Sequence, residues 1–251
     1  MSLLRTERLT KHFGETRAVD GVDFTVNEGE FLSLVGTNGS GKTTLVNLIS
    51  AFLFPDSGRI FIADRDITYA PVDERIRAGI ARSFQLVNLF DDLSVLDNVA
   101  LAIFAREGKT KRIFALAERD TAVTQEATEL LGQFGLAGKA QGLAGGLAQG
   151  ERKLLDVAVA YALRPKLLFL DEPTSGVSTR DKAQIMDTVS SVVRGGGITA
   201  VVIEHDMDVV FKYSDRVVVM HEGRFLADGP PEEIRRNRDV ATYLLGTDVS
   251  D

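Results

Sequence analysis

The chain has 251 residues, of which 44% are apolar and 26% are charged, values that are typical of a globular protein and argue against extended disorder. No run of 18 apolar residues occurs and Met1–Lys11 has no apolar segment, so we expect neither a membrane span nor a secretory signal. The absence of cysteine excludes disulfides, thiolate metal sites and a cysteine nucleophile. A net charge of −7 argues against nucleic-acid binding.

The first part of the chain, Leu3–Val26, alternates apolar and polar residues and predicts an antiparallel β region. Further along, short apolar runs predict buried parallel strands, with helices between them at Lys42–Ser50 and Arg180–Val193. These predicted strands are Glu30–Val35, Leu167–Leu170, Ile198–Ile203 and Arg216–Met220. Strands that alternate with helices indicate an α/β fold with a mostly parallel sheet.

The middle of the chain differs, because residues from about Phe90 to Tyr161 contain no strong strand run. The glycine-rich stretch Gly135–Gly150 predicts a loop. Three other stretches predict helices: Val95–Phe104, Ile113–Phe134 and Gly150–Leu163. We therefore expect one domain over residues 1–251, with a core at about 1–89 and 162–251 and an inserted helical subdomain at about 90–161.

A phosphate-loop pattern, G-x-x-x-x-G-K-[ST], is matched at every fixed position by Gly36–Thr43, between a predicted strand and a predicted helix. Glycines let backbone N–H groups approach phosphates, and the helix start adds its positive dipole end. Lys42 would act in catalysis as a cation beside the β- and γ-phosphates of ATP, and the Thr43 hydroxyl would bind Mg²⁺. The alternative is a chance glycine turn. The predicted nucleotide-binding residues are Gly36, Asn38, Gly39, Ser40, Gly41, Lys42, Thr43 and Thr44.

Two carboxylates, Asp171 and Glu172, follow the apolar run Leu167–Leu170, where α/β folds bind ligands. Asp171 would hold Mg²⁺, and Glu172 would orient and deprotonate the attacking water. Taken alone, this pair would be a solvated turn, but the phosphate loop makes it the expected Walker B site. His205 follows another predicted strand and would hold the attacking water, although a lone histidine there is usually structural.

Together these residues resemble the ATP-binding cassette (ABC) ATPases over essentially the whole chain. The resemblance implies a P-loop NTPase (RecA-like) core with an antiparallel β edge region and an inserted helical subdomain. Phe13, 23 residues before Gly36, matches the aromatic that stacks on adenine; the alternative is an ordinary surface aromatic. Gln85 matches the glutamine that contacts Mg²⁺ and links the core to the helical subdomain; the alternative is a polar residue at a strand end.

The family's signature motif, L-S-G-G-Q, has two candidates in this chain. Leu143–Gly146 looks similar, but the family spacing of 24 residues before the Walker B aspartate selects Leu147 as the start. The matched residues, which would contact the nucleotide of a partner subunit, are Leu147, Ala148, Gln149, Gly150 and Glu151. Ala148 replaces the usual serine, and Ser178 stands where most members carry aspartate, so one composite ATP site would lack two polar contacts.

Finer stretches, among them Ala78–Phe90 and Ile203–Met207, are similar to the larger ATP-binding subunit of branched-chain amino-acid importers. Importers of urea, amides or aromatic acids share these features. The resemblance implies ATP hydrolysis coupled to transport, a second and different cassette, membrane permease subunits, no direct solute binding and a location on the cytoplasmic face of the membrane. Two rivals remain: a soluble ABC ATPase acting on DNA or ribosomes, and a nucleotide-binding partner subunit with weak catalysis.

Overall fold

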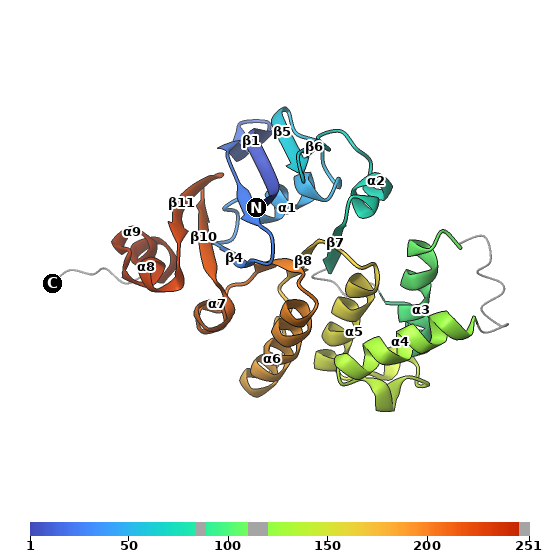
Figure 1. The fold of residues 1–251 in the computed structure, drawn as a ribbon. Helices are drawn as coiled ribbons and strands as arrows, with labels where there is room; N and C mark the ends of the chain where they lie inside the picture. The colour runs from blue at the N-terminus through green and yellow to red at the C-terminus, as the bar shows by residue number, and fades with distance from the viewer. Residues whose placement is uncertain (84–88, 110–119, 246–251) are drawn as a thin grey trace.

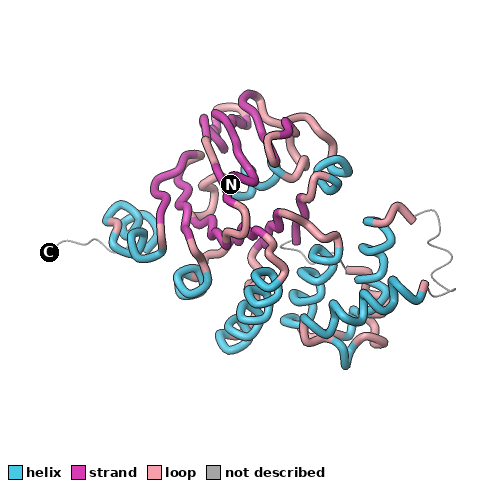
Figure 2. Tube along the Cα trace, in the orientation of Figure 1, coloured by secondary structure: helices cyan, strands magenta, loops and turns pink. Residues whose placement is uncertain are grey.

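The computed structural model describes residues 1–83, 89–109 and 120–245, which form two β-sheets with helices around them (Figure 1, Figure 2). The larger sheet has the order β11 (Arg224–Gly229), β10 (Arg216–His221), β4 (Phe31–Val35), β9 (Thr199–Ile203), β8 (Leu167–Asp171), β7 (Ile80–Ser83). Its strands run parallel except for the β10–β11 pair. The predicted parallel sheet is confirmed.

The smaller sheet is antiparallel and lies at the top of Figure 1. Its order is β2 (Thr16–Val22), β1 (Ser2–Phe13), β5 (Ser57–Ile62), β6 (Arg65–Asp66), and β3 (Thr25–Asn27) pairs with β1. The predicted antiparallel region at Leu3–Val26 is thus confirmed. Strands β5 and β6, which complete the sheet, were not predicted, because their polar residues weaken the alternating pattern.

Helices surround the larger sheet and gather at its two ends (Figure 1). Helices α3 (Val95–Arg106), α4 (Thr121–Gln133) and α5 (Gln149–Ala162) lie together at one end, and α8 (Pro231–Arg236) and α9 (Arg238–Val240) lie at the other. The remaining ones are α1 (Lys42–Ile49), α2 (Val72–Arg77), α6 (Thr179–Gly195), α7 (Met207–Tyr213), short 3-10 turns at Ala137–Lys139 and Ala144–Gly146, and a π-helical turn at Ala241–Leu245.

The helix predicted at Ile113–Phe134 is wrong at Asp120, which lies just outside α4 as its N-cap and accepts a hydrogen bond from the backbone of Val123. An N-cap residue has an extended backbone and therefore cannot continue a helix from the residues before it. Residues 113–119 lie outside the described part of the chain. The limits of the helical subdomain, about residues 90 and 161, stay a prediction.

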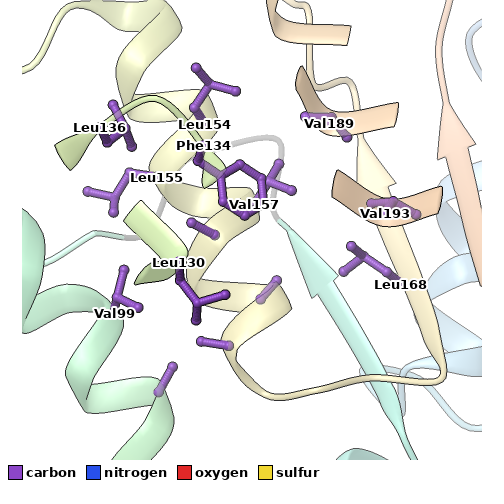
Figure 3. Packing of buried hydrophobic residues seen from close by; sticks show 14 of the residues in the cluster. Val99, Leu130, Phe134, Leu136, Leu154, Leu155, Val157, Leu168, Val189 and Val193 are labelled. Carbon is purple, nitrogen blue, oxygen red and sulfur yellow. The ribbon is translucent and has the colours of Figure 1, made fainter. Parts of the chain in front are cut away.

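Alternate residues of β8 point into two different cores, as expected for a strand buried on both faces. Leu168 and Leu170 pack with helices α3 to α6, and Figure 3 shows Leu168 in this cluster beside Val189 and Val193. Leu167 and Phe169 pack on the opposite face, in the cluster that contains α1 and the antiparallel sheet. The larger sheet, to which β8 belongs, therefore carries helices on both faces. The carboxyl end of β8 lies between these two layers.

Candidate functional site

The phosphate loop joins β4 to α1 and is packed tightly against two other segments. A Cβ atom at Gly36 would lie 2.2 Å from the Met220 carbonyl oxygen, and one at Gly41 would lie 2.1 Å from the Ala18 carbonyl oxygen. Gly41 also has a φ of +109°, a conformation that residues with a side chain rarely adopt. The loop therefore needs glycine at both positions, for contacts that only the folded chain creates.

Lys42 is buried within this loop, where Nζ donates hydrogen bonds to the carbonyl oxygens of Gly36 at 2.8 Å and Thr37 at 3.0 Å. Burial lowers the pKa of Lys42, while the carboxylates of Glu172 and Asp171 raise it in part. The predicted phosphate-binding cation and the two predicted Walker B carboxylates therefore lie within electrostatic reach of one another.

The remaining loop residues border the start of α1. Asn38, Gly39 and Thr43 are exposed, Thr44 is half-buried, and Ser40 is buried. The first N–H groups of a helix have no partner within the helix, and they carry the positive end of its dipole. These backbone donors and the Lys42 cation suit a polyphosphate anion, which is the ligand predicted for this loop.

Glu172 and His205 come from two neighbouring strands and meet at their carboxyl ends. They follow β8 and β9, which pair in parallel, and His205 Nε2 lies 2.9 Å from Glu172 Oε1. The Glu172 backbone has a left-handed φ of +48°, a conformation that costs about 1–3 kcal/mol and is concentrated at functional sites. Lys153 of α5 donates to the Glu172 carbonyl at 3.1 Å and so helps to hold this turn.

Glu204 was not singled out from the sequence, although it supports both predicted catalytic turns. This buried carboxylate accepts hydrogen bonds from the Thr174 backbone at 3.0 Å and the Thr174 hydroxyl at 2.7 Å through Oε1. Its Oε2 accepts from the backbone N–H of His205 at 3.2 Å. Glu204 thus ties the turn after β8 to the turn after β9. Nothing in the sequence indicates that Glu204 is buried, whereas the adjacent His205 is exposed.

Arg82 is a second residue that the sequence pattern did not reveal. Its Nη2 donates to Asp171 Oδ2 at 2.6 Å, and the side chains are only 9% and 8% exposed. The pair joins β7 to the end of β8, its neighbour in the sheet. Gln85, which was predicted to contact the nucleotide and Mg²⁺, lies outside the residues that the structure describes.

Phe13 lies at the end of β1, opposite Thr16 of β2, with half of its surface exposed. The same hairpin reaches the phosphate loop, because the Ala18 carbonyl of β2 fills the space beside Gly41. An exposed aromatic ring on this hairpin is compatible with stacking on a base.

The two departures from the family pattern both occupy helix N-termini. Ala148 is the N-cap of α5, and its backbone N–H donates to Glu151 Oε2 at 3.0 Å, but alanine has no side-chain oxygen to cap the helix. Ser178 is the N-cap of α6, and its hydroxyl accepts from the Asp181 backbone at 3.3 Å and donates to Asp181 Oδ2 at 2.7 Å. The cap at α6 is therefore made by serine.

The rest of the predicted signature stretch lies around the start of α5. Leu147 is buried and Gln149 is exposed. The Gln149 amide nitrogen lies 2.4 Å from where a Cβ atom at Gly176 would stand, so this stretch packs against the turn before α6. Gly150 begins the helical face that meets Ile185 of α6.

A phosphate-loop motif and a carboxylate–histidine contact on this fold are the features expected of an ATP-binding cassette. Residues 19–175 match the family model described as "ABC transporter". The chain is 35% identical to the probable branched-chain amino acid transport ATP-binding protein LivG of Methanocaldococcus jannaschii, over 94% of this chain and 93% of that protein. The chain therefore belongs to the ABC transporter family, and it is an ATPase of that family.

Solved structures agree with this assignment. The ADP conformation of an ATP-binding cassette of an ABC transporter superposes with a TM-score of 0.86 at 32% identity, covering 98% of this chain and all of that one. A dimeric cassette in a post-hydrolysis state, bound to ADP and Pi, superposes with a TM-score of 0.77 at 26% identity, covering 91% of this chain and 99% of that one. Within the described part of the chain, no helix is long and apolar enough to cross a membrane.

Proposed function

We propose that this chain is the ATP-binding and ATP-hydrolysing subunit of an importer for branched-chain amino acids or related small solutes. The contact between Glu172 and His205, within the electrostatic reach of Lys42, carries the proposal for hydrolysis. The printed function of the M. jannaschii relative supports the solute class. The solute itself would bind to other subunits.

ATP would bind with its phosphates in the loop and its adenine against Phe13. The backbone N–H groups and Lys42 would hold the β- and γ-phosphates. The Thr43 hydroxyl follows Lys42 at the start of α1, and the Asp171 carboxylate lies within electrostatic reach of Lys42; the two side chains offer oxygen ligands of the kind that Mg²⁺ prefers. When bound there, Mg²⁺ would neutralise part of the charge of the phosphates.

Glu172 would act as the general base. It would accept a proton from water as the water oxygen attacks the γ-phosphorus, and the bond from that phosphorus to the leaving oxygen of ADP would break, which gives ADP and inorganic phosphate. His205, in contact with Glu172 Oε1, would keep the carboxylate and the water aligned. Glu204 would hold both turns in place, since its three hydrogen bonds join them.

The partner of the nucleotide site would be a second cassette, with each ATP lying between the phosphate loop of one subunit and the signature stretch of the other. The dimeric post-hydrolysis relative supports a pair of cassettes. ATP would then favour the closed dimer because it binds that state more tightly.

An exposed apolar patch on the core would dock a cytoplasmic helix of the permease, and so hold the chain on the inner face of the membrane. The patch consists of Phe52, Phe54, Tyr69, Val72 and Ile76, all exposed. The rings of Phe54 and Tyr69 are 6.2 Å apart, and the others line one cavity of 140 Å³. Large exposed apolar side chains gathered in this way mark an interaction site.

The transport proposal predicts ATP-driven uptake of leucine, isoleucine or valine when this chain, its partner cassette and its permeases are reconstituted in vesicles with a solute-binding protein. Uptake should require Mg-ATP on the side that carries this chain. Amides, urea and aromatic acids serve as the comparison solutes. ATP hydrolysis that never drives uptake of a branched-chain amino acid would contradict the proposed solute class.

We further expect a heterodimer, because Ala148 and Ser178 face the nucleotide of the partner rather than that of this chain. The isolated chain should sediment as a monomer and hydrolyse ATP slowly, whereas the mixture with its partner should be dimeric and faster. Ala148→Ser should alter turnover at the partner's site through the restored hydroxyl, which is worth about 1.5–3 kcal/mol to a charged group. It should leave ATP affinity at this chain's own loop unchanged. A stable homodimer of the isolated chain with full activity would exclude the heterodimer.

A further inference from the structure

The ion pair between Arg82 and Asp171 follows from the register of β7 and β8. Arg82 stands opposite Phe169, and Asp171 lies two residues beyond Phe169 on the same strand. Because side chains alternate across a strand, Arg82, Phe169 and Asp171 share one face of the sheet. That face is the one covered by α1, whose first residue is Lys42. Arg82 therefore lies beneath the phosphate-loop helix.

Arg82 also contacts residues that connect Asp171 with the helix and with the surface. Nη1 donates to Asn47 Oδ1 at 2.6 Å and to Ser50 Oγ at 3.4 Å, both near the end of α1. Its guanidinium carbon lies 5.8 Å from the centre of the Phe52 ring. Phe52 is 53% exposed and belongs to the apolar patch defined above. One side chain thus spans from the Walker B aspartate to the patch.

A buried ion pair rarely contributes net stability, because desolvation of the two charges offsets their attraction. Such a pair instead fixes the orientation of the carboxylate, because the flat guanidinium group sets the direction of each hydrogen bond that it donates. In this chain the fork holds one carboxylate oxygen of Asp171, Oδ2, and the amide oxygen of Asn47 at the same time. The fork does not hold the other oxygen of Asp171, Oδ1, which could therefore face a metal ion or its water.

We propose that Arg82 is a positioning residue that orients Asp171 toward Mg²⁺ and links that orientation to contact at the Phe52 patch. The inference rests on the proposed function, since it assumes that Asp171 faces the metal of Mg-ATP. Without Arg82, Asp171 would be free to turn toward Lys42, whose pKa its charge already raises. A permease helix that presses on Phe52 would shift the guanidinium beneath it, and so the carboxylate at the other end.

The test measures Mn²⁺ affinity, by electron paramagnetic resonance of the full chain with saturating ATP. Arg82→Met should weaken Mn²⁺ binding by about 10-fold or more, as expected when a residue that orients a metal ligand is lost. Arg82→Lys keeps the charge but loses the fork, so it should weaken binding by a smaller factor. Phe52→Ala, a change at the exposed end of the link, should weaken binding by about 2-fold, in keeping with the loss of a modest cation–π contact.

Arg77→Met is the matched control, because Arg77 is an exposed arginine of α2 that pairs only with Asp73 at 3.0 Å in the described structure. This control should bind Mn²⁺ as the wild type does. ATP-dependent Mn²⁺ binding by the wild type with equal affinity in Arg82→Lys and Phe52→Ala would overturn the inference, even if Arg82→Met fails to fold. Absence of ATP-dependent Mn²⁺ binding in the wild type would instead overturn the proposed function.

Discussion

Glu172→Gln is expected to retain ATP binding and to lower the turnover rate by about 10²–10⁴-fold, the usual contribution of a general base. Glutamine keeps the shape of the side chain but cannot accept the proton of the attacking water. The hydrogen bond with His205 can persist through the amide, so the turn with its left-handed backbone should remain folded. The measurement is steady-state phosphate release beside equilibrium ATP affinity.

The same substitution should accumulate an ATP-bound dimer with the partner cassette, because hydrolysis would normally reopen the closed state. Sedimentation with ATP and Mg²⁺ detects this species. Glu129→Gln makes the same chemical change on the exposed face of α4 and should behave as the wild type. If Glu172→Gln turned over ATP at near the wild-type rate, another group would have to be the base.

Lys42→Ala is expected to weaken ATP binding by roughly 10- to 100-fold, which corresponds to loss of hydrogen bonds from a charged donor worth about 1.5–3 kcal/mol. The substitution removes the cation that we propose lies beside the phosphates. It also leaves the carbonyl oxygens of Gly36 and Thr37 without the donor that they have now. Nucleotide affinity should therefore be compared at equal circular dichroism and thermal stability.

Lys212→Ala provides the control for charge, because Lys212 is an exposed lysine on α7, away from the loop. Its ATP affinity should equal that of the wild type. Together with the Glu172 variant, the experiment separates binding from hydrolysis: Lys42→Ala should fail at the first step and Glu172→Gln at the second. Unchanged affinity in a folded Lys42→Ala protein would mean that the loop does not cradle phosphate.

Much of the fold could be predicted because the relevant signals are local. An unbroken apolar run such as Leu167–Leu170 predicts a strand buried on both faces, and β8 occupies that position. The start of α4 could not be placed in the same way. Apolar spacing across Ile113–Phe134 does not show which polar residue will leave the helix and cap it, and here that residue is Asp120.

The candidate site divides in a similar way. Lys42 stands at the start of a predicted helix, and Glu172 and His205 each stand two residues after a predicted strand, so α/β topology predicts that all three lie at one edge of the sheet. Arg82 and Glu204 were missed because they act on residues far away in the chain: Arg82 on Asp171, and Glu204 on Thr174. No short pattern records contacts across such separations.

The sequence by itself determined the family and the candidate site of this protein: the predicted phosphate loop, the paired carboxylates and the apolar runs that build the sheet are each contiguous, and their spacing carries the family resemblance. Only the tertiary structure decided the geometry around them. The pairing of β7 with β8 brings Arg82 into hydrogen-bond distance of Asp171. The pairing of β8 with β9 brings His205 into hydrogen-bond distance of Glu172. The physical reason is that hydrogen bonds and ion pairs of this kind depend on distances of about 3 Å, which folding alone sets.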